Sequence, residues 1–162
     1  MNFQIGDRIA HPLHGAGVID RVESRRVGGV TREYYVLKLQ STGMVVMIPK
    51  NAGRETGVRP IVDRSAIRRL FARIPELNVP MTGSWNRRYR ENMQRIKSGD
   101  LEQLAGVIKA LTERAAVRPL STGERSMLQQ ARQILLSEIS LSADCPYDLA
   151  ETWLDQCLCK PK

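Results

Sequence analysis

A tryptophan followed closely by three arginines is the strongest candidate for chemistry in this sequence of 162 residues. Arg87, Arg88 and Arg90 lie within five positions after Trp85. Guanidinium groups bind phosphates well, and a large flat apolar group can insert at a deformable DNA step. The spacing also places Trp85 on one helical stripe with Tyr89, which favours packing in a core. A buried indole and a DNA-facing indole are therefore both hypotheses for this stretch.

The residues that most often bind metals are few and scattered. His11 and His14 are separated by three positions, but Pro12 between them predicts a turn and not a helix that presents two ligands. The cysteines lie near the C-terminal end, at Cys145, Cys157 and Cys159. An odd number of cysteines without a neighbouring histidine is typical of reduced thiols and not of a zinc site. We therefore expect no metal site and no cofactor.

Catalytic patterns are also missing from the sequence. The glycine pair at residues 28 and 29 lacks the lysine and the following helix of a phosphate-binding loop. No serine lies in the pattern of a nucleophile elbow, and most acidic residues fall at predicted helix starts, where capping explains them. A hydrolase or metalloenzyme thus has no supporting constellation. The sequence predicts a binding protein and not an enzyme.

The positive charge of the chain is concentrated in its front and middle. The net charge is +8, and residues 63–100 alone hold nine basic and four acidic side chains. Residues 101–162 hold seven basic and eight acidic side chains. This asymmetry favours a polyanionic partner, because neutralising phosphates releases counterions. A solvated basic face is the alternative interpretation of the same composition.

Membrane and export signals are not evident in the sequence. No run approaches the roughly 20 apolar residues needed to cross a bilayer. The first residues lack the basic and apolar stretches of a signal peptide. We therefore expect a cytoplasmic protein without a membrane partner.

Two kinds of periodicity divide the chain. The first part alternates apolar and polar residues, with a glycine hairpin tip at residues 28 and 29. This pattern predicts short strands at residues 3–10, 18–23, 32–39 and 44–49. Strands at this spacing predict a small, strongly bent antiparallel β-barrel over residues 1–62.

The remainder, residues 63–162, has helical periodicity. Ser84 and Asp100 are predicted N-caps, and Ser121 with Glu124 forms a capping box. A last helix follows Pro146, with an apolar face at Leu149, Trp153, Leu154 and Cys157. The predicted fold class is therefore α+β, with an antiparallel β-domain followed by an all-helical bundle.

Taken together and in order, several short stretches resemble the CarD/CdnL family of bacterial transcription factors. Each stretch is unspecific alone, but their order and spacing are specific, and the resemblance covers nearly the whole chain. The stretches lie at residues 5–7, 11–15, 34–38, 48–49, 85–89, 98–100, 120–125, 127–128 and 131–135.

The resemblance implies a Tudor-like N-terminal domain that binds the β subunit of RNA polymerase, similar to a module of transcription-repair coupling factors. Arg25 and Val27 match a basic and an apolar residue that the family uses against polymerase. Met47 lies at a position of the same interface where close relatives carry an arginine.

The resemblance also implies a helical domain that contacts promoter DNA at the upstream edge of the melted region. Trp85 matches the tryptophan that inserts into the minor groove there, and Arg87, Arg88 and Arg90 match basic positions of the family. The implied outcome is a longer-lived open complex of the holoenzyme with the housekeeping sigma factor, notably at ribosomal RNA promoters. We expect a monomer that associates with the nucleoid through polymerase. The alternative is an adaptor that binds polymerase without contacting DNA.

Overall fold

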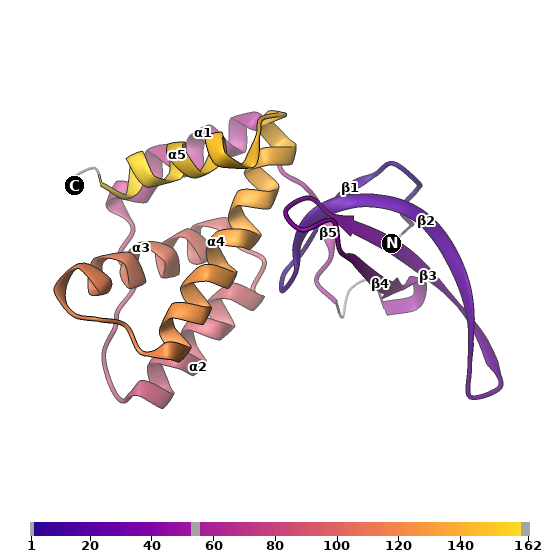
Figure 1. Ribbon diagram of the computed structural model, residues 1–162, viewed down its shortest axis with the longest axis horizontal. Helices are drawn as coiled ribbons and strands as arrows, with labels where there is room; N and C mark the ends of the chain where they lie inside the picture. Colours follow the sequence, from indigo (N-terminus) through magenta and orange to yellow (C-terminus); the bar gives the residue numbers. More distant parts are fainter. Residues whose placement is uncertain (1, 53–55, 160–162) are drawn as a thin grey trace.

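The computed structural model describes residues 2–52 and 56–159, and it has the predicted α+β architecture. An N-terminal antiparallel sheet lies beside a C-terminal group of helices (Figure 1). The sheet has the order β4-β3-β2-β1-β5, so that β4 and β5 form its edges. Its elements are β1 (Arg8–His11), β2 (Gly15–Val27), β3 (Val30–Leu39), β4 (Val45–Pro49), the 3-10 turn η1 (Lys50–Ala52) and β5 (Arg59–Pro60).

The first two strands differ most from the predicted ranges. The first strand was expected from residue 3, but β1 starts only at Arg8, because Gly6 turns the chain with a φ of 93°. The amide of Gln4 donates to the Asp7 carboxylate across this turn, at 2.8 Å. The second strand is longer than expected and continues through the exposed residues up to Val27. Alternation predicted only the half-buried part of that strand, because an exposed ribbon has no buried face to create the pattern.

The sheet bends around a small apolar core. Ile19 and Leu37 of this core are essentially inaccessible to solvent. The pairing of β2 with β3 shifts register between Ile19 and Arg21, which marks a β-bulge. A bulge bends its strand and increases the local twist, so this irregularity helps the sheet to enclose the core. The core residues are Ile9, Ile19, Tyr35, Leu37, Leu39, Ile48 and Val58.

The helices begin where local capping signals predict. Ser84 and Asp100 accept hydrogen bonds from the first turns that follow them, and Ser121 forms the complete capping box with Glu124. None of the described helices is long and apolar enough to cross a membrane. The helical elements are α1 (Arg64–Arg73), the 3-10 turn η2 (Ile74–Glu76), α2 (Trp85–Lys97), α3 (Leu101–Val117), α4 (Thr122–Ala143) and α5 (Tyr147–Leu158).

The helices enclose a second apolar core, which includes Ile108, Leu135 and Leu154. The predicted apolar face of α5 is only partly buried. Leu149 is 40% exposed, because it lies one position away from the buried stripe of Ala150, Leu154 and Cys157. Trp153 packs against the core but stays half-buried, so core packing does not cover its whole ring.

The C-terminal half of α4 joins the two parts of the molecule. Every residue from 134 to 141 is buried, although an amphipathic helix normally leaves one face exposed. One side of this segment packs in the helical core and the other contacts β2. The Ser137 hydroxyl accepts a hydrogen bond from the Ala16 amide at 2.8 Å. A Cβ atom on Gly15 would lie 2.6 Å from that hydroxyl, so only glycine allows this approach.

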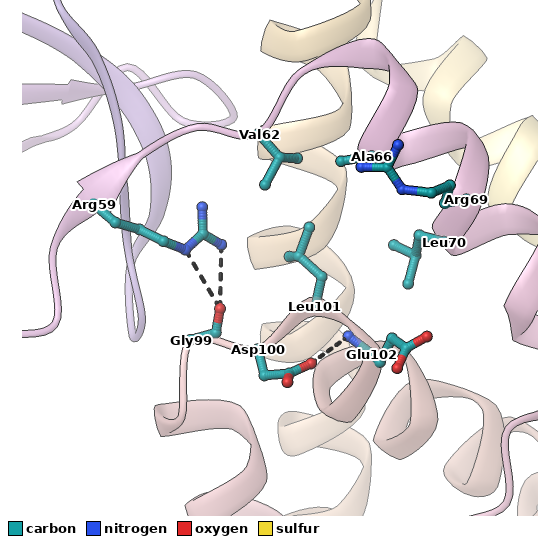
Figure 2. Close-up of a pocket in the computed structure, with 9 residues that line it drawn as sticks. All are labelled: Arg59, Val62, Ala66, Arg69, Leu70, Gly99, Asp100, Leu101 and Glu102. Carbon is teal, nitrogen blue, oxygen red and sulfur yellow. Dashed lines mark hydrogen bonds between the residues drawn. The ribbon is translucent and has the colours of Figure 1, made fainter.

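A buried ion pair lies in the same interface. Glu138 is 1% exposed, and both of its carboxylate oxygens accept hydrogen bonds from Arg59 of β5, at 2.7 and 2.9 Å. The Val62 amide donates a third hydrogen bond at 2.9 Å. The same arginine donates to the Gly99 carbonyl, as Figure 2 shows. A buried carboxylate needs such compensation, so Arg59 fixes the sheet against the helices.

Replacing Arg59 by methionine is predicted to lower the free energy of unfolding by about 3 kcal/mol, because it leaves the Glu138 carboxylate buried and unpaired. Urea denaturation followed by circular dichroism measures this loss. The matched control is Arg73→Met, since Arg73 pairs with Glu76 and Glu102 at 3.0 Å on an exposed surface. The control should cost much less, because water screens an exposed ion pair. Equal losses in the two variants would contradict the structural role of Arg59.

His11 makes the stability of this interface depend on pH. Burial and the neighbouring His14 lower the pKa of His11 from 6.5 to about 4. Its Nδ1 atom accepts a hydrogen bond from the Leu13 amide at 3.1 Å, which requires the neutral ring. In the unfolded chain, His11 takes up a proton near its ordinary pKa of 6.5. In the folded chain, it takes up this proton only near pH 4. Stability is therefore lost as the pH falls from about 6.5 towards 4.

The variant His11→Gln, which lacks this titration, should lose less stability than the wild type over that pH range. Urea midpoints at pH 7, 6, 5 and 4 test the prediction. Parallel pH profiles for the two proteins would show that His11 titrates normally in the folded chain.

Candidate functional site

The apolar stripe of α2 runs from the surface into the core. Trp85 and Tyr89 are 41% and 39% exposed, Met93 is half-buried, and Ile96 is 1% exposed. The helix begins at Trp85 because the Ser84 hydroxyl accepts a hydrogen bond from the Arg87 amide. Trp85 and Tyr89 therefore lie at the exposed end of the stripe, near the start of α2. The stripe is thus a core face that ends in an exposed aromatic pair, and a contact between Trp85 and DNA stays a prediction.

The indole is held from three directions. Its ring stacks on Tyr89, with centroids 5.2 Å apart and planes inclined by 20°. Its Nε1 atom donates to the Ser121 hydroxyl at 3.1 Å. The edge of the ring lies against Gly123, where a Cβ atom would be 2.8 Å from Cζ2. We call Trp85, Tyr89, Ser121 and Gly123 the indole site.

The three arginines after Trp85 do not form one patch. Arg87 donates to Glu91 at 2.9 Å, and this pairing raises the pKa of Arg87 and lowers the pKa of Glu91. Arg88 is half-buried and donates to the Gly83 carbonyl at 2.9 Å. Arg90 is exposed and has no hydrogen bond or ion pair to any described residue. Arg88 is three positions after Trp85, which makes the two residues neighbours on the helix surface, whereas Arg87 and Arg90 are two and five positions away.

Sequence reasoning missed the contribution of α4 to the indole site. Ser121 and Gly123 were interpreted only as parts of a helix start, and nothing in the sequence links them to a tryptophan 36 residues earlier. Two further exposed arginines, Arg118 and Arg125, lie within four positions of Ser121 along the chain. They add positive charge near the start of α4, outside residues 85–90.

The residues predicted to contact polymerase share one face of the sheet. Residues directly opposite each other on paired strands point to the same side, as do alternate residues along one strand. These two rules place Arg25, Val27 and Met47 on the same side of the sheet. The cross-strand pairs that establish this face are Arg25 with Arg32, Val27 with Val30, and Met47 with Val36. We call Arg25, Val27, Val30, Arg32 and Met47 the hairpin surface.

The outer part of the hairpin surface has features that the fold itself does not require. Val27 and Val30 are 59% and 54% exposed at the tip, next to a two-residue turn of Gly28 and Gly29. Arg25 lies opposite Arg32, and like charges in directly opposed positions destabilise a hairpin. The ribbon also extends past β4, whose last pair joins Pro49 to Tyr34. Arg25 also pairs with Glu23 at 3.3 Å, so its charge is partly balanced. The exposed valines at the tip are typical of a protein-binding surface.

Other candidate sites carry no comparable arrangement. Among residues 2–52 and 56–159, no group of three or more His, Cys, Asp and Glu could hold a metal ion. The His11 and His14 rings lie 4.5 Å apart in the predicted turn. Burial raises the pKa of the Cys145 thiol, which makes the nucleophilic thiolate rarer.

The cavity of Figure 2, of about 340 Å³, lies between β5, α1 and the start of α3. Arg59 in its wall is already bound to Gly99 and Glu138. Asp100 and Glu102 add negative charge next to Arg69 in the same wall. This mixture gives the cavity no preference for an anion or a cation.

Comparison with known proteins relates both parts of the chain to one family. Residues 3–62 match the family model described as "CarD-like/TRCF RID domain", and residues 69–155 match "CarD, C-terminal domain". A curated relative, "Putative transcription factor YdeB" from Bacillus subtilis, is 31% identical over 139 residues. That alignment covers 86% of this chain and 91% of the relative.

A solved structure, the 72-residue N-terminal domain of Myxococcus xanthus CarD, is 25% identical and covers 36% of this chain and 79% of its own. Its TM-score of 0.32 does not establish a shared fold.

Proposed function

The chain belongs to the CarD family, and we propose on this basis that it regulates transcription initiation by binding RNA polymerase and promoter DNA at once. The hairpin surface binds the β subunit of polymerase. The indole site contacts DNA at the upstream edge of the melted region. The exposed Trp85 indole, fixed between α2 and α4, is the observation that carries the proposal.

The match of residues 3–62 to a domain shared with TRCF supports the polymerase contact. The hairpin surface has the composition that such a contact needs. Its tip offers apolar area from Val27 and Val30, and Arg25 and Arg32 add paired positive charge. An acidic patch on the β subunit would relieve the repulsion between these two arginines, so that binding gains both burial and charge compensation.

The geometry of the indole site supports a DNA contact. An aromatic group that inserts at a base step must stay exposed and keep its orientation, and the Trp85 ring does both. Arg88 next to it and the unpaired Arg90 are suited to flanking phosphates. The backbone amides at the start of α2 add a favourable dipole towards a phosphate.

The mechanism is a shift in an equilibrium and not a chemical step. A protein that binds the melted promoter better than the closed promoter stabilises the open complex by that difference in affinity. A difference of about 1.4 kcal/mol changes the equilibrium tenfold. Attachment to polymerase raises the local concentration of the indole site near the DNA, so weak DNA affinity suffices. The holoenzyme with the housekeeping sigma factor is the proposed context, with ribosomal RNA promoters among its targets.

The variant Trp85→Ala is predicted to keep its fold and polymerase affinity but to shorten the lifetime of the open complex by roughly tenfold. The measurement is the decay of open complexes after addition of a competitor, with purified holoenzyme and a ribosomal RNA promoter. Trp153→Phe is the control, because it changes the other tryptophan, which lies on α5. Equal lifetimes with wild type and Trp85→Ala would leave only the adaptor hypothesis, in which polymerase is bound without a DNA contact.

The variant Arg25→Glu is predicted to lose at least tenfold in affinity for core polymerase, because it puts a carboxylate in the centre of the hairpin surface. Arg26→Glu is the matched control, since Arg26 is also exposed but points to the other face of the same strand. A pull-down or titration with core polymerase compares the two variants. Equal losses of affinity in the two variants would show that only the net charge of the chain matters. Unchanged binding of Arg25→Glu would show that polymerase contacts another surface.

A further inference from the structure

The hydroxyl of Ser121 is the centre of a small polar network beside the indole. It accepts hydrogen bonds from Trp85 Nε1 at 3.1 Å and from the Glu124 amide at 3.2 Å. It donates to the Glu124 carboxylate at 3.0 Å. The other oxygen of that carboxylate lies 3.2 Å from Arg114 Nε, on α3. The indole is thus connected through the first turn of α4 to an ion pair between two helices.

We propose that Ser121, Gly123, Glu124 and Arg114 form a seat that fixes the orientation of the Trp85 indole for insertion into DNA. These are positioning residues, and none of them needs to touch DNA. The proposal deepens the function given above and rests on it. It implies that two helices outside α2 determine how well the indole stabilises the open complex.

The direction of each hydrogen bond in the seat is determined by chemistry. A serine hydroxyl has one proton to donate and two lone pairs to accept with. A carboxylate only accepts, so the proton of Ser121 points to Glu124 and a lone pair faces the indole N–H. Glu124 is 8% exposed, and Arg114 Nε lies 3.2 Å from its second oxygen as an ion pair, without hydrogen-bond geometry. The ion pair therefore keeps Ser121 available as an acceptor for Trp85.

Gly123 provides the space into which the ring fits. Its backbone is helical, so the position does not need glycine for its conformation. The close neighbours of a Cβ atom at this position are all atoms of the Trp85 ring, the nearest at 2.8 Å. A separation below 3 Å forces the ring to move. The glycine thus serves the orientation of the indole and lowers the helix propensity of α4.

The effects of Gly123 on the helix and on the indole can be tested separately. Gly123→Ala should raise the helix propensity of α4 but displace the Trp85 ring. Ser121→Gly removes the acceptor for the indole, yet glycine is a tolerated N-cap. Ser121→Thr keeps both the cap and the acceptor and should behave like the wild type. Gln129→Ala is the control, because it changes an exposed position of α4 with no bond to the indole.

The first experiment follows Trp85 in the free protein, in a Trp153→Phe background so that one indole is observed. Time-resolved fluorescence anisotropy measures the fast local motion of the ring, and acrylamide quenching measures its accessibility. We expect Gly123→Ala and Ser121→Gly to increase the fast component about twofold or more, while Ser121→Thr and Gln129→Ala leave it unchanged. Unchanged motion and accessibility in both seat variants would overturn the proposal, whatever their effect on transcription.

The second experiment measures open-complex lifetime with the same proteins, together with Trp85→Ala. Preorganisation lowers the entropic cost of binding, so a mobile indole should shorten the lifetime by roughly threefold to tenfold. Gly123→Ala should do so without loss of thermal stability, which a purely structural role would not produce. If Trp85→Ala shortens the lifetime and the seat variants do not, the seat is irrelevant to function. If Trp85→Ala has no effect, the proposed DNA contact fails, and the fluorescence result alone decides whether the seat orients the ring.

Discussion

The buried carboxylate of Glu138 is the constraint on which the arrangement of the molecule depends. It lies on α4 in the interface between sheet and helices, and Arg59 of β5 and the Val62 amide satisfy its oxygens. Separating the two parts would expose an apolar interface and leave this charge without its partner. Charged hydrogen bonds in a buried site also require defined geometry, so the interface specifies one relative orientation of the hairpin surface and the helices.

The long helix α4 transmits this orientation to the indole site. Its C-terminal half is buried against the sheet, and its first turn contacts Trp85. Ser121 and Glu138 are 17 residues apart, which corresponds to roughly 25 Å along a helix. One helix therefore connects the sheet, which carries the hairpin surface, with the indole site. Figure 1 shows how α4 runs along the helical half and ends at the sheet. A fixed distance between two interfaces suits a protein that must place an aromatic ring at one point of a promoter.

Local signals in the sequence predicted the elements well, and contacts between distant residues remained hidden. The predicted caps at Ser84, Asp100 and Ser121 are confirmed. They could be predicted because capping involves residues only two or three positions apart. Trp85 was predicted as a candidate from its own neighbours. The contact of its indole with Ser121 spans 36 residues, and the Arg59–Glu138 pair spans 79. No periodicity or motif links residues at such separations, so only the fold could reveal them.

The central claim is that one chain holds polymerase with the hairpin surface and brings the indole site to the edge of the promoter bubble. Photo-crosslinking from a reactive residue at position 89 to promoter DNA, in complexes with holoenzyme, tests it most directly. Crosslinks are expected only at the upstream edge of the bubble, and they should disappear when Arg25→Glu weakens attachment to polymerase. Crosslinks spread along the DNA, or crosslinks that persist unchanged in the Arg25→Glu variant, would contradict it.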